Sequence, residues 1–135
     1  MVDYPPDIMC MNMEDALEYY YKGLSHQENG NFDDALNCFY KSLEIDEHFK
    51  TYHRVYQILK VQEKQNESFT ALQKAFQLNM RNDKVASDYA EMLIALNRYK
   101  EANDILLSIL ERNPTYRYAN ELIALLNAHN KQQTD

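Results

Sequence analysis

Apolar residues recur along this chain with the spacing of amphipathic helices. In segments 13–28, 49–62 and 83–96 they fall at positions i, i+3, i+4 and i+7, which places them on one face of an α-helix. A second helix-sized segment follows each of these, and the three followers resemble one another: GNFDDALNCFYKSLEID from Gly30, EKQNESFTALQKAFQLN from Glu63 and NRYKEANDILLSILERN from Asn97. A repeat of this length built from two helices predicts stacked helix pairs rather than one irregular core.

A seventh amphipathic helix is predicted over residues 116–130. It carries one apolar stripe of Ala119, Leu122, Ile123 and Leu126, and a polar side of Asn120, Glu121, Asn127 and Asn130. The last pair of a stack exposes an apolar face, and such a helix would cover it. We therefore expect one helical domain over 13–130, with repeats at about 15–48, 49–82 and 83–116, a capping helix at 116–130, and flexible tails at 1–12 and 131–135.

Residues suited to helix ends lie at the expected boundaries. Asn12 and Asn31 are placed to accept hydrogen bonds from the free amides at the start of the first and second helices. Gly30 supplies the positive φ that ends the first helix. Pro114 ends the third pair, because its ring and missing N–H cannot continue a helix.

Composition narrows the possible functions. The formal net charge of −7 opposes a sequence-independent grip on nucleic-acid phosphates, and no apolar run is long enough to span a bilayer. The N-terminal residues lack the basic-then-apolar order of a secretory signal. The cysteines, Cys10 and Cys38, have no partner spacing, which is typical of a reducing compartment. We expect a cytoplasmic protein that binds no nucleic acid and does not insert into membranes.

Catalytic chemistry finds little support. The four histidines are scattered, and no cysteine or carboxylate at ligand spacing completes a zinc set around them. With only two glycines, Gly23 and Gly30, there is no phosphate-binding loop. We expect no enzyme activity, no metal and no cofactor.

The repeat resembles the tetratricopeptide repeat, a 34-residue helix–turn–helix with the signature W-x2-L-G-x2-Y…A-x3-F…P. The matching positions are Tyr19, Gly23, His26, Ala35 and Phe39 in the first repeat, Tyr52, Val55, Leu59, Ser68, Leu72 and Ala75 in the second, and Tyr89, Ala90, Leu93, Ala102, Leu106 and Pro114 in the third. The resemblance covers roughly residues 15–130. It implies an all-α, right-handed solenoid whose first helices line a concave groove for a protein or peptide partner.

By this resemblance the groove would be lined by inward positions of the first helices. Those we assign are Tyr20, Tyr21 and Leu24 from the first repeat, Lys50, His53, Arg54, Gln57 and Lys60 from the second, and Lys84, Asp88 and Glu91 from the third, with Leu17, Gln27, Ser87, Ile94, Tyr118 and Leu125 beside them. Basic charge gathers at Lys50, Arg54, Lys60 and Lys84, with an aromatic end at Tyr20 and Tyr21. This pattern favours a ligand segment with a carboxylate and an apolar anchor; the alternative is an ordinary solvated charged face.

Some family members bind the acidic C-terminal tails of heat-shock chaperones through a clamp of lysine, asparagine and arginine. Here the clamp positions hold Tyr20, Leu24, Arg54, Lys84 and Asp88, and only Lys84 matches, which argues against that ligand. Two alternatives to the adaptor function remain open. One is a chaperone similar to those of type III secretion translocators. The other is a subunit that self-associates into a homo-oligomer. The apolar N-terminal residues could also occupy the chain's own groove or dock onto a second copy.

Overall fold

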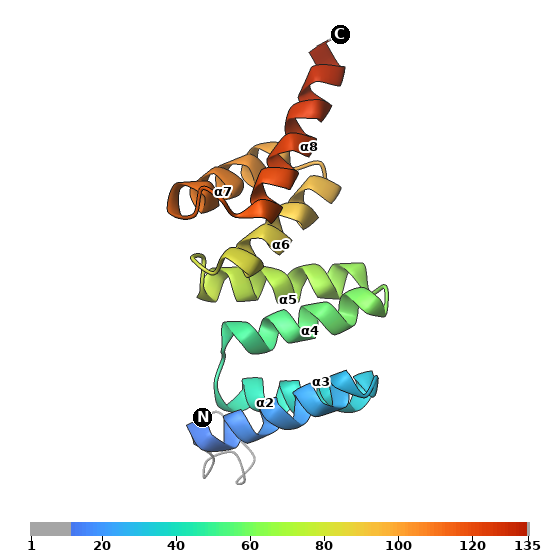
Figure 1. The fold of residues 1–135 in the computed structure, drawn as a ribbon. Helices are drawn as coiled ribbons and strands as arrows, with labels where there is room; N and C mark the ends of the chain where they lie inside the picture. The colour runs from blue at the N-terminus through green and yellow to red at the C-terminus, as the bar shows by residue number, and fades with distance from the viewer. Residues whose placement is uncertain (1–11, 135) are drawn as a thin grey trace, which may run out of the picture. The chain divides into compact units, whose positions relative to one another are not determined.

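The computed structural model describes residues 12–134, which form seven α-helices and no strand (Figure 1). The helices are α2 (Met13–Glu28), α3 (Phe32–Ile45), α4 (Phe49–Val61), α5 (Gln65–Leu78), α6 (Asp83–Ala95), α7 (Tyr99–Arg112) and α8 (Arg117–Thr134). Consecutive helices pack as the pairs α2–α3, α4–α5 and α6–α7, and α8 packs on α7. The predicted all-α arrangement of three helix pairs and a seventh helix is confirmed.

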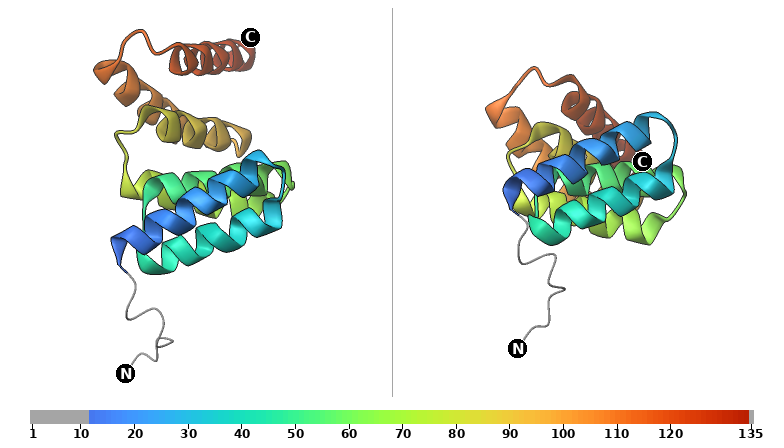
Figure 2. Two further views of the ribbon diagram at one scale, coloured as in Figure 1. Left: turned by 60° about the horizontal axis from the view of Figure 1, so that its bottom comes forward. Right: turned by 90° about the horizontal axis from the view of Figure 1, so that it is seen from below.

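The helices group into two compact units, with the boundary between Leu78 and Asn79. The N-terminal unit contains the pairs α2–α3 and α4–α5, which lie side by side (Figure 2). The C-terminal unit contains α6, α7 and α8. The prediction of a single domain over 13–130 stays a prediction, and each unit is described by itself.

In the N-terminal unit, small residues allow α2 and α3 to approach each other closely. The Phe39 ring is fully buried, and it lies where a side chain at Gly23 would be: a Cβ on Gly23 would come within 2.5 Å of Phe39 Cε1. The buried Ser42 hydroxyl donates a 2.7 Å hydrogen bond to the Ala16 carbonyl oxygen. Gly23 and Phe39 stand at positions that the repeat signature names, and the structure places them in contact.

In the C-terminal unit, α8 covers α7 with the predicted stripe. Ala119, Leu122 and Leu126 are buried, and the imidazole of His129 lies against the Tyr99 ring, with 4.4 Å between ring centroids. The polar residues predicted for the opposite side of α8 are exposed. The helix is longer than the expected 116–130 and runs to Thr134, so residues 131–134 are helical although we expected a flexible tail. No glycine or proline interrupts this end of the chain, and Lys131 in the last turn complements the helix dipole.

The helix ends follow the expected chemistry in part. Asn12 caps α2: its Oδ1 accepts from the amides of Glu14 and Asp15 at 3.0 and 3.3 Å, and Asp15 accepts from the Asn12 amide in return. The prediction that Asn31 caps α3 is wrong, because its side chain makes no capping hydrogen bond and its backbone is not extended, with φ −84° and ψ 71°.

The turns between paired helices all use a left-handed residue. Gly30 has φ +77°, as predicted. The equivalent turns place Glu63 at φ +61° and Asn97 at φ +62°. Asparagine tolerates this conformation, whereas glutamate is strained in it.

The prediction of a flexible tail at 1–12 concerns, apart from Asn12, residues outside the described range.

Candidate functional site

The positions of α2 that we predicted to face inward form an exposed apolar stripe. Leu17 is 51% exposed and Tyr21 is 63% exposed, while Leu24, one turn further on, is half-buried. Met13 continues the stripe toward the start of the helix and is also exposed. Side chains spaced four residues apart lie one above another on a helix. The first predicted groove helix therefore presents a continuous apolar surface.

Tyr20 differs from its neighbour Tyr21 in where its ring lies. The Tyr20 ring is half-buried against the Phe39 ring, with centroids 5.8 Å apart, and meets the Tyr21 ring edge-on at 5.6 Å. Phe39 belongs to α3, so Tyr20 helps to pack the helix pair and leaves Tyr21 as the open aromatic surface.

The positions of α4 that we predicted to face inward carry basic charge. Lys50 and Lys60 are exposed and Arg54 is half-buried. Among residues 12–134, no carboxylate lies within 4.0 Å of the charged atoms of these three side chains. The Lys60 ammonium instead lies 5.8 Å from the centre of the Tyr56 ring, on which His53 stacks at 5.7 Å. The positive charge of α4 is thus not neutralised by the described part of the chain.

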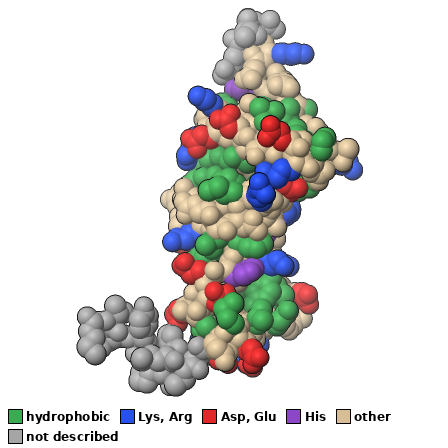
Figure 3. All heavy atoms as spheres, turned by 90° about the vertical axis from the view of Figure 1, so that its left-hand side faces the viewer, with side chains coloured by type: hydrophobic (Ala, Val, Ile, Leu, Met, Phe, Trp, Pro, Cys, Tyr) green, Lys and Arg blue, Asp and Glu red, His purple; other side chains and the backbone are tan. Residues whose placement is uncertain are grey.

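A short hydrogen-bond chain joins the two helices. Gln57 Oε1 accepts from Gln27 Nε2 of α2 at 3.3 Å and from Arg54 Nη1 at 3.5 Å. Leu17, Tyr21 and Leu24 precede Lys50, Arg54 and Gln57 by one repeat, so these six residues occupy equivalent positions on neighbouring helices. We call this set the α2–α4 face. Figure 3 shows that hydrophobic, basic and acidic side chains are all present on one face of the molecule.

The predicted site residues of the C-terminal unit are arranged differently. Lys84 Nζ lies 3.1 Å from Asp88 Oδ1, one turn along α6, and 5.1 Å from the centre of the Tyr118 ring of α8. Asp88 is only 7% exposed, and Glu91 is exposed. Ser87 is fully buried, so it does not line a surface. The charge of Lys84 is therefore balanced within the unit, unlike the charges on α4.

The described residues contain neither a cluster of metal-ligand side chains nor a helix that could span a membrane. Between residues 12 and 134 there is no cluster of three or more histidine, cysteine or acidic side chains that could hold a metal ion. None of the helices described here combines the length and apolar character needed to cross a bilayer.

Comparison with known families identifies the class of protein. Two tetratricopeptide-repeat models match the chain, one over residues 16–49 and the other over residues 62–126. This chain belongs to the tetratricopeptide-repeat family. No curated protein sequence matches it.

Solved structures with the same fold share little sequence with the chain. The first tetratricopeptide-repeat domain of Spaghetti (RPAP3), bound to the HSP90 peptide SRMEEVD, has a TM-score of 0.75 at 20% identity, with 88% of this chain and 95% of that chain covered. The Arabidopsis OM64 domain has a TM-score of 0.74 at 19% identity and covers 88% and 99%. The first domain of human RPAP3 has a TM-score of 0.73 at 19% identity and covers 91% and 98%. These similarities establish the fold.

Proposed function

We propose that this chain is a non-catalytic, cytoplasmic adaptor that binds a segment of another protein on the α2–α4 face. The observation that carries the proposal is the juxtaposition on this face of exposed apolar side chains, Leu17 and Tyr21, with basic side chains, Lys50 and Arg54, that have no carboxylate partner among the described residues. Tetratricopeptide repeats are typically protein-interaction modules, and stacked repeats of this kind create extended surfaces that bind partners.

The chemistry of the face defines the ligand. An aliphatic or aromatic side chain would cover Leu17 and Tyr21, which removes apolar surface from water on both partners. A carboxylate one repeat further along would bind Arg54, whose half-buried guanidinium makes stronger charged hydrogen bonds than a fully solvated one. We therefore propose that the ligand is an acidic segment with one apolar side chain. The apolar side chain would bind on α2 and the carboxylate on α4.

A chaperone tail is not the ligand that we propose. The similar Spaghetti (RPAP3) domain is bound to an HSP90 peptide, but only Lys84 matches the clamp that such binding uses. In this chain Lys84 already forms an ion pair with Asp88. We expect the peptide SRMEEVD to bind with a Kd weaker than about 1 mM, because fewer charged contacts remain for its carboxylates.

Isothermal titration calorimetry with a matched pair of variants tests the proposal. The probe is a short peptide that contains one leucine and two glutamates, found by screening a peptide array of that composition. Arg54→Glu should weaken its binding by about ten-fold or more, since a charged hydrogen bond is worth about 1.5–3 kcal/mol. Lys64→Glu makes the same charge change at an exposed turn outside the face and should change affinity by less than about two-fold. Equal affinities for the wild type and Arg54→Glu would refute the proposal.

Self-association is a second candidate, and the exposed stripe on α2 favours it. Met13, Leu17 and Tyr21 offer an apolar surface on which the same stripe of another copy could pack. Light scattering at two protein concentrations distinguishes the two functions. A mass that rises with concentration in the wild type but not in Leu17→Glu supports self-association, and a constant monomer mass excludes it.

A further inference from the structure

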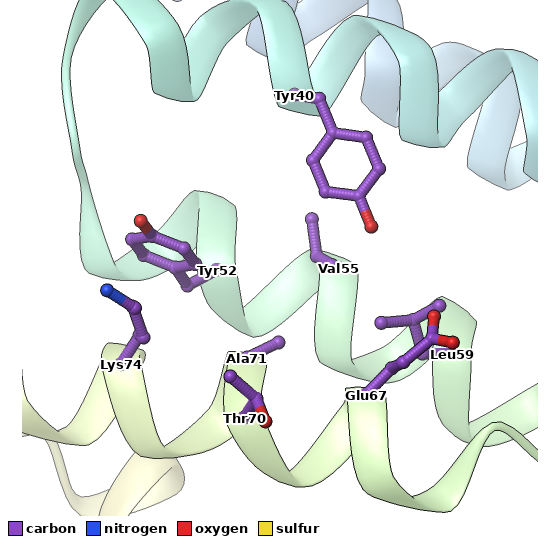
Figure 4. A pocket seen from close by; sticks show the side chains of 8 residues that line it. All are labelled: Tyr40, Tyr52, Val55, Leu59, Glu67, Thr70, Ala71 and Lys74. Atoms are coloured by element: carbon purple, nitrogen blue, oxygen red, sulfur yellow. The ribbon is translucent and has the colours of Figure 1, made fainter.

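A hollow lies in the N-terminal unit, on the other side of α4 from the α2–α4 face. It is an open pocket of about 280 Å³ between α3, α4 and α5 (Figure 4). On α4, the residues that line it are Tyr52, Val55 and Leu59. By helical periodicity these point nearly opposite to Lys50, Arg54 and Gln57. A ligand in this pocket would therefore leave the α2–α4 face free.

The pocket has an apolar floor and an aromatic wall. Val55, Leu59 and Ala71 form the floor and are themselves almost fully buried. Tyr40 extends from α3 over this floor, with its hydroxyl on the side of Leu59 and Glu67 (Figure 4). Tyr40 is 44% exposed and is the one large apolar side chain exposed on α3 within the described residues. It is thus an exception on a helix whose other exposed residues are polar.

Opposite charges stand at the two ends of the pocket. Figure 4 shows Lys74 beside Tyr52 at one end and Glu67 beside Leu59 at the other. These two charged residues are seven positions apart on α5, which corresponds to a rise of about 10 Å. Neither forms an ion pair with another residue in the described part of the chain. Both are exposed, and both are available to an incoming ligand.

The Tyr40 hydroxyl lies on the same side of the pocket as Glu67 (Figure 4). Partial burial and, secondarily, the negative charge of Glu67 raise the pKa of Tyr40. No hydrogen bond joins the Tyr40 hydroxyl to another residue between 12 and 134. The hydroxyl is therefore a polar group at the pocket that a ligand can satisfy.

We propose that this pocket docks a helical segment of a partner protein through one leucine-sized side chain, with a basic residue one turn to one side facing Glu67 and an acidic residue one turn to the other side facing Lys74. Residues three or four positions on either side of a central residue in a helix are about 9–12 Å apart along its axis, which matches the separation of the two charges. The buried floor accepts the apolar side chain, and the charge order at the ends selects the flanking residues.

This proposal does not depend on the function of the α2–α4 face. If both sites are used, one unit holds two segments on opposite sides of α4. Because the residues are separate, Arg54→Glu should leave binding at the pocket unchanged, so that failure of one proposal does not imply failure of the other.

The test is an NMR titration of the ¹⁵N-labelled full chain with designed helical peptides. The mixed peptide has lysine four residues before, and glutamate four residues after, a central leucine in an alanine-rich helix. We expect it to shift the backbone amides of residues 67–74, and replacement of its leucine by alanine should weaken binding at least about five-fold. A dibasic peptide, with lysine on both sides, should bind the wild type about two- to five-fold more weakly than the mixed peptide, the effect of one mismatched surface charge.

Protein variants reverse this preference or block the pocket. Lys74→Glu makes both ends acidic, so this variant should prefer the dibasic peptide over the mixed one by about two- to five-fold. Thr70→Trp fills the pocket from its exposed rim and should abolish the shifts. Gln77→Trp, an exposed change on the same helix outside the pocket, should preserve them.

Three results would overturn the proposal. The first is that the mixed peptide shifts no pocket amide at millimolar concentration, or that its alanine version binds equally well. The second is that removal of residues 1–11 tightens binding several-fold, which would identify the chain's own N-terminal segment as the occupant. The third is that the pocket amides shift on dilution of the protein alone, which would identify a second copy.

Discussion

Replacing Gly23 by alanine tests the close contact on which the first helix pair depends. The new methyl group would lie 2.5 Å from Cε1 and 2.6 Å from Cδ1 of the Phe39 ring. Phe39 is fully buried, so its ring cannot move into solvent to make room. The change therefore adds volume at a point where the packing has no space.

Two effects of opposite sign determine the result. Alanine is a better helix former than glycine by about 1 kcal/mol, which stabilises α2. Inserting a methyl group into a filled core costs about 1–3 kcal/mol, and the short distances at Gly23 favour the upper end of that range. The free energy of unfolding should fall by about 2 kcal/mol, equivalent to a melting temperature lower by several degrees in a chain of this size.

Denaturant unfolding followed by circular dichroism measures the free energy of unfolding. Two further variants show whether a loss of stability comes from the contact between residue 23 and Phe39. Ser25→Ala lies on the exposed side of the same helix and should raise stability slightly, because it improves helix propensity without a clash. In Gly23→Ala combined with Phe39→Leu, the smaller side chain should relieve part of the overlap, so the two costs should not add. A Gly23→Ala protein as stable as Ser25→Ala would show that the tight contact is not a constraint on the fold.

The remaining predictions concern the turn at Glu63 and the titration of Tyr52. Glu63→Gly should raise the free energy of unfolding by about 0.5–1 kcal/mol, because glycine adopts a positive φ without strain. Asn97→Gly should raise it little, because asparagine already tolerates this conformation and the substitution removes the 2.7 Å hydrogen bond that Asn97 accepts from the Tyr99 hydroxyl. Burial and the 2.8 Å hydrogen bond to Glu47 raise the pKa of Tyr52 to about 12, so the folded state favours the neutral phenol. That stabilisation is fully present below pH 10 and is lost as the pH rises from 10 to 12. The hydroxyl is largely solvated, so we expect no more than about 1 kcal/mol, measured as the difference in pH dependence between the wild type and Tyr52→Phe.

The helices were predictable from the sequence because the hydrophobic periodicity and the repeat pattern indicate the same helical segments. Each predicted first helix begins and ends within about two residues of its position in the structure, since the apolar stripe and the turn residues mark the same boundaries. Gly23 and Phe39 were aligned to the repeat signature from sequence alone, and the structure places them in contact. Local pattern and tertiary packing point to the same fold here.

Features that depend on side-chain orientation were harder to predict. Asn31 has the residue type of a cap, but its backbone conformation keeps the side chain from the free amides. The positive φ of Glu63 could not be predicted from the sequence, because glutamate is not a residue type typical of turns. The pocket beside Tyr40 was missed altogether. Its lining comes from three helices, and the one signal in the sequence was an aromatic residue on an otherwise polar face of α3.

The arrangement of charge at equivalent repeat positions supports the proposal that α4 binds the carboxylate of an acidic ligand. At the position of Tyr21, the second repeat has Arg54 and the third has Asp88. Asp88 forms an ion pair with Lys84 one turn away, so α6 presents little net charge at these positions. On α4 the corresponding residues are both basic and have no carboxylate partner among residues 12–134. At these equivalent positions, basic side chains without a carboxylate partner among the described residues occur on α4, which is why Arg54→Glu is expected to weaken the binding of a carboxylate strongly.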